Sequence, residues 1–467
     1  MAYDADINRL RSSIRGRVIL PCDADYDSAR EIWNRRFDSR PAMVIKCAGQ
    51  DDVRAAIHFA RDQGLDVTVR GGGHHVAGYA SVEGGVIIDL SDMCAIRVDP
   101  DQRKATAQAA ARWGEFDKET QAHRLACTGP IVSLTGLSGF TLGGGFGWLQ
   151  RKVGLGCDNL LAADVLTADG SIVRASLKDD SELLWGLRGA GWNFGVVTSL
   201  EFSLHRIGPE VLAGLIYFPI EKLHSLAAFH QEVIERSPPE LTTWFVLRLA
   251  PPTKDIPEAT RGKPVCALAF CHCGGRDEAE KWVEIVRGFA PGIADSVQWR
   301  PYVDWQKGLD GRWGNGFYNE WRSHYFDALD PACVTTLIDY LGHLDSPWTD
   351  VKISHLGGAI ATVPQGGSAF QGRQRRFVLV IQARWQDADE SEKNLVWARA
   401  LQEDLEPFAA DGVYLNFLAR DESSRIVSAY SQADYLRLQA LKARLDPDNV
   451  FHNNPNIPPR YPLSSTS

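Results

Sequence analysis

The sequence predicts an α+β protein made of two domains. The chain has 467 residues, which is too long for one compact hydrophobic core and sufficient for two. Its first part alternates amphipathic helical segments with short β-branched runs, and the composition changes near residues 205–209, where we place a domain boundary. With 44% hydrophobic and 23% charged residues, the composition is that of an ordinary globular protein.

Periodicity and turn residues predict the elements of the first part. Residues 52–62 repeat apolar side chains at helical spacing, and residues 65–69 form a strand that runs directly into a Gly-Gly-Gly-His sequence. Turn signals at Asp99-Pro100-Asp101 and Asp169-Gly170 predict two hairpins. The other elements expected here are strands over 86–90, 96–98, 104–109, 163–167, 172–175 and 196–204, and a helix over 180–187.

The middle of the chain, residues 210–410, mixes strands with amphipathic helices and is rich in aromatic residues. Residues 378–383 are predicted as a strand and residues 392–401 as a helix. Near the end, Leu438, Leu441 and Leu445 share one face of a helix that stops before a proline.

Charge and composition restrict the partners and the location of the protein. The net charge of −9 is dispersed, which argues against nucleic acid because a phosphate backbone selects basic surfaces. No run approaches the roughly 18 apolar residues that a membrane-spanning helix requires. The N-terminus lacks a basic and then apolar signal pattern, so we expect a cytoplasmic protein, monomeric or homodimeric, that does not bind membranes.

Cysteine usage gives no indication of a disulfide framework or a metal centre. The nine cysteines form no CxxC pair. The sequence Cys271-His272-Cys273 has no second ligand pair and ends an apolar run, so we interpret it as part of a packed strand and expect no metal.

Three glycine clusters are the first functional signal. They lie at residues 71–73, 143–147 and 189–195. Glycine lets successive backbone N–H groups approach a ligand, and such turns suit a pyrophosphate. None of the clusters gives the Rossmann G-x-G-x-x-G pattern or a P-loop, and G-x-S-x-G is also missing. Tight turns between strands would explain one cluster and explain three less well.

The motifs around these glycines resemble those of a known flavoprotein family. Arg70-Gly-Gly-Gly-His74-His75-Val-Ala-Gly78-Tyr79 is similar to the flavin-attachment loop of the vanillyl-alcohol oxidase superfamily, and its berberine bridge enzyme-like branch, in bacterial form, matches best. Gly136 to Trp148, Gly154 to Leu161 and Leu187 to Thr198 resemble the next blocks of that branch, and Tyr414 to Phe417 and Leu445 to Pro459 resemble its closing segment. The resemblance is loose in the middle of the chain.

The resemblance implies an α+β fold in which the chain leaves the cofactor domain and returns to it. Residues 1–206 would form most of a FAD-binding domain with two subdomains, and residues 411–467 would complete it. Residues 207–410 would form a substrate domain with an antiparallel sheet backed by helices.

The resemblance also implies FAD bound through one covalent link. His74 matches the histidine that bonds to the flavin 8α carbon, and a bond of this kind typically raises the reduction potential. His75 is the adjacent alternative. Some relatives add a cysteinyl link, but Val132 stands at the matching position and Cys127 is out of register. The other residues expected to bind FAD are Arg70, Gly71, Gly72, Gly73, His75, Gly78, Tyr79, Thr135, Gly136, Gly139, Gly143, Gly144, Gly145, Gly147, Asp158, Asn193, Gly195, Val196, Asn416, Asn454 and Asn456.

The implied reaction is hydride transfer from a small organic substrate to FAD, followed by reoxidation by O2 to H2O2. Many relatives use the last tyrosine of a Tyr-x-Asn-Tyr motif as a base, whereas Phe417 here cannot accept a proton. Either the substrate needs no base or another residue supplies one. Our catalytic candidates are His355, Tyr325 and Gln382, and our substrate-binding candidates are Tyr302, Trp321 and Phe417.

Three other functions are compatible with the same motifs. The protein could be a dehydrogenase that reacts slowly with oxygen, or an oxidative cyclase that makes a natural product. A non-catalytic flavin-binding protein is the alternative from another class.

Overall fold

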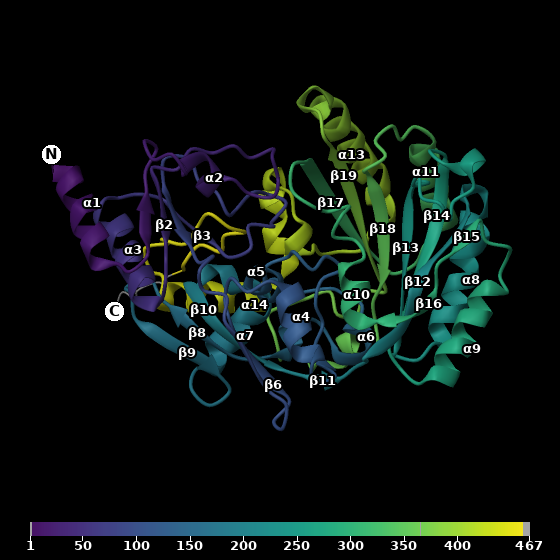
Figure 1. Cartoon of the computed structure of the whole chain (residues 1–467), viewed down its shortest axis with the longest axis horizontal. Helices are drawn as coiled ribbons and strands as arrows, with labels where there is room; N and C mark the ends of the chain where they lie inside the picture. Colours follow the sequence, from purple (N-terminus) through teal and green to yellow (C-terminus); the bar gives the residue numbers. More distant parts are fainter. Residues whose placement is uncertain (1, 365, 461–467) are drawn as a thin grey trace, which may run out of the picture.

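The computed structural model describes residues 2–364 and 366–460. It has two lobes, with residues up to about 204 and the C-terminal segment on one side and the middle of the chain on the other (Figure 1). The fold is α+β, as the sequence predicts. Hydrophobic side chains form a separate core in each lobe.

The first sheet has four strands and leads into the glycine turn. Strands β2, β4 and β3 are parallel and β1 is antiparallel to β2. Because β3 ends at Arg70, the chain leaves this sheet at its edge and enters the turn at Gly71. The elements are α1 (Ala2–Ser13), β1 (Arg17–Ile19), α2 (Tyr26–Arg30), β2 (Met43–Lys46), α3 (Gln50–Asp62), β3 (Val67–Arg70) and β4 (Val86–Asp89).

The second sheet has five antiparallel strands in the order β5-β6-β10-β8-β9. Both predicted hairpins are present, between β5 and β6 and between β8 and β9. Its strands are β5 (Ile96–Asp99), β6 (Lys104–Gln108), β8 (Leu160–Leu166), β9 (Ile172–Ser176) and β10 (Val196–Ser203). The same part of the chain contains the helices α4 (Trp113–Gln121), α5 (Leu137–Leu142), α6 (Gln150–Val153) and α7 (Ser181–Ala190), and β7 (Leu125–Ala126) and β11 (His205–Arg206) pair with each other as a separate two-stranded sheet.

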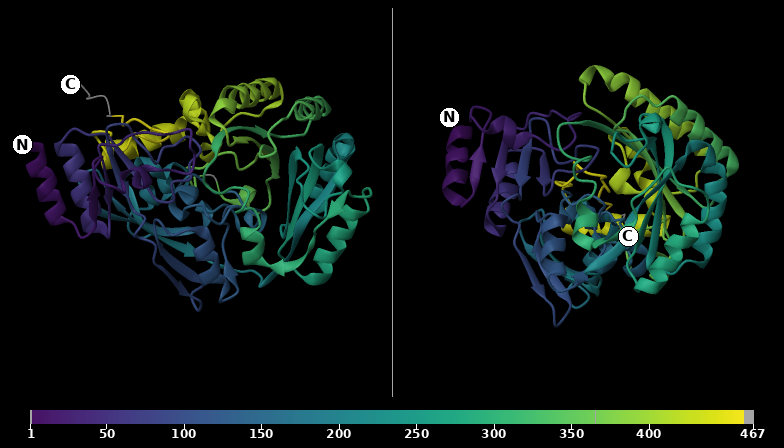
Figure 2. Two further views of the ribbon diagram at one scale, coloured as in Figure 1. Left: turned by 45° about the horizontal axis from the view of Figure 1, so that its top comes forward. Right: turned by 45° about the vertical axis from the view of Figure 1, so that its right-hand side comes forward.

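One large antiparallel sheet forms the second lobe, in the order β15-β12-β14-β13-β18-β19-β17, with β16 also paired to β12. Helices α8, α9, α11 and α13 cover its outer face, as two further views show (Figure 2). The elements are β12 (Glu210–Pro219), α8 (Leu223–Arg236), β13 (Leu241–Leu249), β14 (Pro264–His272), α9 (Arg276–Arg287), β15 (Ala294–Asp295), β16 (Gln298–Pro301), α10 (Tyr302–Lys307), β17 (Tyr318–Phe326), α11 (Pro331–Gly342), β18 (Asp350–His355), α12 (Ala359–Thr362), β19 (Phe377–Trp385) and α13 (Ser391–Leu405).

The end of the chain returns to the first lobe, where it appears yellow in Figure 1. Leu438 and Leu441 of α14 (Gln432–Leu445) are buried in the core of that lobe together with residues of α7. The buried Lys442 ammonium donates hydrogen bonds to the backbone oxygens of Asn193 and Phe451, both at 2.8 Å. These bonds fix the closing segment against the loop after α7.

Two features bear on the expected partners. Cys271 packs inside the core at the end of β14, as the strand interpretation predicts, and the described residues contain no cluster of metal-ligating side chains. None of the helices built by residues 2–364 and 366–460 has the length and apolar content to cross a membrane.

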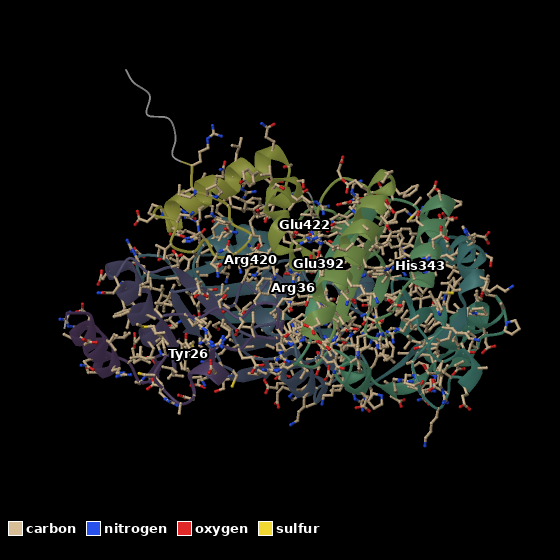
Figure 3. The ribbon with its side chains drawn as sticks, turned by 90° about the horizontal axis from the view of Figure 1, so that it is seen from above. Tyr26, Arg36, His343, Glu392, Arg420 and Glu422 are labelled. Atoms are coloured by element: carbon tan, nitrogen blue, oxygen red, sulfur yellow. The ribbon has the colours of Figure 1, made fainter. Side chains whose placement is uncertain are left out.

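A buried ion network joins three distant parts of the chain. The Glu320 carboxylate of β17 pairs with Arg36 from the N-terminal part and with Arg322. Arg322 also lies 2.8 Å from Asp421 and 3.7 Å from Glu422, both in the returning segment. Figure 3 labels Arg36 and Glu422 where these parts meet. The side chains of Glu320 and Arg322 are each 4% exposed, so water screens their charges little.

We expect Glu320→Gln to lower the thermal unfolding midpoint by roughly 5 °C, because it leaves buried guanidinium charges with less compensation. Differential scanning calorimetry measures the change. The matched control is Asp345→Asn, which breaks an exposed pair with Lys393 whose side chains are 65% and 64% exposed. We expect that control to shift the midpoint by less than about 1 °C. Equal shifts in the two variants would contradict the structural role of the network.

Candidate cofactor and substrate site

A cavity lies between the two lobes. Together with the open space at its mouth it encloses about 1780 Å³. Its first half is formed by the first lobe and the end of the returning segment. Its second half is formed by the inner face of the large sheet together with Trp33, His74 and residues 131–132 and 414–417. The first half includes Val67, Thr68, Val69, Gly71, Gly72, Gly73, His75, Tyr79, Thr135, Gly136, Gly139, Gly195, Val197, Phe451, Asn453 and Asn454; the second includes Trp33, His74, Ile131, Val132, Trp244, Trp313, Trp321, Lys352, Ser354, Val378, Val380, Gln382, Tyr414, Asn416 and Phe417.

Two glycine turns meet at the first half of the cavity. A Cβ atom on Gly72 would lie 2.5 Å from the Cα atom of Gly136, and a Cβ on Gly136 would lie 2.6 Å from the Cα of Gly72. No side chain fits between backbones that approach so closely. Among the described residues, the backbone N–H groups of residues 71–76 have no hydrogen-bond acceptor. Successive free N–H groups form a concave site for an anion such as a diphosphate.

His74 follows this turn and lies beside an aromatic ring. Its imidazole is stacked on the Trp33 indole, with 5.1 Å between ring centroids and 19° between planes. Trp33 is held in turn by hydrogen bonds from its indole N–H to Trp313 O at 2.9 Å and from its backbone N–H to Gly73 O at 3.3 Å. Burial, assisted by the charges of Arg112 and Arg384, lowers the pKa of His74 to about 3, so the ring is neutral at pH 7. Neither ring nitrogen of His74 is hydrogen-bonded within the described part of the chain.

His75 points toward other partners. Its Nδ1 accepts a hydrogen bond from the Ala77 N–H at 3.1 Å. Its ring packs edge-on against Tyr79 and Trp192, with centroids 4.9 and 5.9 Å away. Burial lowers the pKa of His75 to about 4. The two adjacent histidines therefore differ, since one ring nitrogen of His75 already has a partner.

Strand alternation decides which side chains of the large sheet reach the cavity. Side chains on alternate residues of a strand point to opposite faces. Lys352 and Ser354 of β18 lie on the inner face, and their partners across the ladder, Val380 and Val378 of β19, lie there too. Gln382, two residues further on β19, is opposite Trp321 of β17, and both line the cavity.

Three of the predicted catalytic and substrate-binding residues do not reach the cavity. His355 lies on the outer face of the sheet, where its ring contacts His230 of α8 at 6.1 Å and Phe377 at 5.8 Å between centroids. Tyr325 is on the inner face of the sheet, but its side chain does not reach the cavity and is buried in a cluster with Phe370, Val378 and Tyr414. Tyr302 is fully buried in the cluster that contains Trp148 and Trp305. We therefore correct these three predictions, whereas Gln382, Trp321 and Phe417 lie on the wall.

The expected cofactor residues divide into those on the wall and those behind it. Arg70 is paired with Asp89 at 2.8 Å, and Asp158 is paired with Arg373 at 2.6 Å. The Gly145 N–H donates to the Tyr414 hydroxyl at 3.0 Å, so the second glycine cluster supports the wall from behind. The full set that does not line the cavity is Arg70, Gly78, Gly143, Gly144, Gly145, Gly147, Asp158, Asn193, Val196 and Asn456.

Several residues of the wall could not be selected from sequence patterns alone. Trp33 lies in a segment without regular periodicity, so no pattern marks it. Lys352 had a usable signal, because a lysine inside the buried strand Asp350–His355 is unexpected unless it has a function. Trp244 and Trp313 are aromatic residues among many, and only the fold distinguishes them from core side chains.

Comparison with known proteins supports a flavoprotein. A family model described as an FAD binding domain matches residues 41–176, and one described as berberine and berberine like matches residues 413–458. The first includes the glycine turn and His74, and the second includes Asn416, Phe417 and Asn454. The free N–H groups and the side-chain-free cradle at Gly72 and Gly136 suit the diphosphate of such a dinucleotide.

Relatives match along almost the whole chain. The (R)-6-hydroxynicotine oxidase of Paenarthrobacter nicotinovorans is 30% identical over 463 residues, covering 96% of this chain and 97% of that protein. The crystal structure of 6-hydroxy-D-nicotine oxidase from Arthrobacter nicotinovorans has a TM-score of 0.86 at 28% identity, covering 96% and 99%. The xylooligosaccharide oxidase of Myceliophthora thermophila has the same fold, with a TM-score of 0.83 at 21% identity over 99% of this chain and 100% of that one. This chain therefore belongs to the berberine bridge enzyme-like family of FAD-linked oxidoreductases.

Proposed function

We propose that this protein is an oxidase that holds FAD through a single covalent bond from His74 and oxidises a small organic substrate with O2 as electron acceptor. The main observation behind this proposal is that the His74 imidazole, at the end of the glycine cradle, is neutral and has no hydrogen-bond partner among the described residues. Relatives named as oxidases of hydroxynicotine and of oligosaccharides support the reaction class. Residues 1–206 and 411–467 would bind the cofactor, and residues 207–410 would bind the substrate.

The surroundings of His74 suit a nucleophile. Only a neutral imidazole has a free nitrogen lone pair, and burial keeps the pKa of this ring far below 7. Stacking on Trp33 fixes the ring plane, which favours attachment in one orientation. Val132 lies on the same wall without a sulfur atom, and Cys127 is fully buried away from it, so one link is expected.

The large sheet supplies the substrate half of the site. FAD, when bound, would accept a hydride from the substrate and give up electrons to O2 as H2O2. Trp33, Trp321 and Phe417 surround this half with apolar rings and exclude water from it. Phe417 contributes shape and no proton transfer, and of the catalytic residues expected from the sequence only Gln382 remains on the wall. The Gln382 Oε1 has no hydrogen-bond partner among the described residues, which leaves it free for a substrate donor.

Adding a methyl group at the contact between Gly72 and Gly136 should prevent cofactor binding. We expect Gly72→Ala to give folded but colourless protein, because the added methyl group overlaps Gly136 and displaces the free N–H groups. The flavin-to-protein absorbance ratio measures the loss, and circular dichroism checks the fold. Gly342→Ala is the control, since a Cβ there meets nothing within 4 Å. A Gly72→Ala protein that binds FAD and is yellow would refute the proposal that this glycine turn binds the diphosphate.

Removing the His74 imidazole should abolish covalent attachment. We expect nearly all colour to precipitate with wild-type protein in acid, and none with His74→Ala, which would bind FAD only reversibly. His75→Ala is the matched control and should keep its colour through precipitation, because His75 already uses Nδ1 in a hydrogen bond. Colour that stays with the His74→Ala polypeptide would disprove the assignment.

Reaction with oxygen separates an oxidase from a dehydrogenase. We expect anaerobically reduced protein to reoxidise in aerated buffer at least as fast as it turns over, with peroxide formed as substrate is consumed. Stopped-flow absorbance and a peroxidase-coupled assay measure the two quantities. Negligible reoxidation beside rapid turnover with a dye would identify a dehydrogenase. A flavin that no substrate bleaches would favour a non-catalytic protein.

A further inference from the structure

The substrate half of the cavity contains one charged side chain. Of the residues that line the cavity, Lys352 is the only Lys, Arg, Asp or Glu. Its side chain is 2% exposed, and its ammonium nitrogen has no hydrogen-bond partner among the described residues. A buried charged donor without an acceptor is unfavourable. The Lys352 nitrogen lies 4.4 Å from the centre of the Trp313 ring, a cation–π contact that leaves its N–H groups without an acceptor in the described part of the chain. These free N–H groups on the wall indicate a ligand atom that accepts hydrogen bonds.

The carboxylate nearest to Lys352 is already occupied by two arginines. Asp350 accepts hydrogen bonds from Arg248 at 3.0 Å and from Arg312 at 2.7 and 3.2 Å. The Lys352 nitrogen lies 3.7 Å from the same carboxylate, beyond hydrogen-bond distance. Asp350 is the only carboxylate within ion-pair distance of these three cations in the described chain. When Lys352 is protonated, the cluster therefore has an excess of positive charge.

A fourth cation stands beside this cluster. Arg384 of β19 donates to Asn319 Oδ1 at 3.2 Å and to Gly314 O at 2.7 Å, and its guanidinium lies 3.8 Å from the centre of the Phe317 ring. It has no carboxylate partner within the part of the chain that the structure describes. Burial lowers the pKa of Arg384 to about 9, which leaves it charged at neutral pH. No acidic side chain on the cavity wall offsets these charges.

The rest of the wall offers aromatic faces and further donors. The Trp321 ring lies edge-on to both Trp33 and Trp313, at 5.7 Å between centroids in each case. The indole N–H groups of Trp244, Trp313 and Trp321 have no acceptor among the described residues. A planar aromatic ring would pack against these faces. A polar substituent on that ring would face mostly hydrogen-bond donors.

We propose that the substrate is a planar aromatic anion, a carboxylate or a phenolate, whose oxygen is bound by the Lys352 ammonium. The inference rests on the proposed function and adds the chemical class of its substrate. A protonated amine is disfavoured, because the wall has no carboxylate to receive it. Burial lowers the pKa of Lys352 to about 7 against the opposing effect of Asp350, and a bound anion would stabilise the protonated form.

Binding of two isosteric probes to the holoenzyme tests this proposal. At pH 6.5, 2-naphthoate and the uncharged 2-naphthamide are titrated, and binding is measured by tryptophan fluorescence quenching and by the change in flavin absorbance. We expect naphthoate to bind at least about tenfold more tightly, because only the anion can form an ion pair with the buried ammonium. Equal affinities, tighter naphthamide binding or no naphthoate binding would overturn the proposal. None of these results depends on whether the flavin is covalent or reacts with O2, so a failure here is distinct from a failure of the proposed function.

Variants of Lys352 and Gln382 separate charge from shape. We expect Lys352→Met to weaken naphthoate binding about tenfold or more and to leave naphthamide binding nearly unchanged, whereas Lys352→Arg keeps the preference for the anion. Gln382→Met is the comparison variant, since it removes a neutral polar group from the same wall without changing the charge, and naphthoate should remain the tighter-binding probe. A Lys352→Met protein that retains the naphthoate preference would refute the role of this lysine. If Lys352→Met does not fold, the comparison of naphthoate and naphthamide binding to the wild-type protein still tests the proposal.

Discussion

The contact between Gly72 and Gly136 is the constraint on which the cofactor half of the structure depends. Two backbone turns from different parts of the first lobe approach so closely that neither position has room for a Cβ atom. This contact aligns the free N–H groups of residues 71–76 and sets the direction in which the chain leaves β3. The position of the His74 ring beside Trp33 follows from that direction.

The substrate half depends on a different principle, the alternation of side chains along β-strands. On β18, residues 350, 352 and 354 face the first lobe, while Val351 and Ile353 face the helices. The inner face can therefore carry a lysine and a charged cluster without disturbing the core on the outer face. Such a cluster is weak evidence for stability, because desolvation of the charges offsets their attraction. Its position next to the cavity gives it a functional explanation.

The sequence was sufficient to predict the local structure and the cofactor loop. The helix predicted over 52–62, which the structure extends to Gln50–Asp62, both hairpins and the strand that enters the glycine turn follow from periodicity and turn residues. The motif around His74 pointed to FAD. The sequence could not predict on which face of the sheet a single residue would lie. His355 was selected for its chemistry, yet strand alternation places it behind the sheet, one residue from Ser354 on the wall. Trp33 was missed because its place beside His74 is fixed by tertiary contacts with residues 73 and 313, which no local pattern reveals.

The cavity is assembled from segments that lie far apart in the chain, and this has a consequence for biosynthesis. The glycine turn and His74 leave the ribosome early, whereas Asn416, Phe417 and Asn454, which also line the cavity, are translated near the end. A nascent polypeptide thus displays the histidine long before it has an enclosure around it. If His74 attaches the cofactor as proposed, a product of premature termination would carry that residue without the returning segment that completes the cavity.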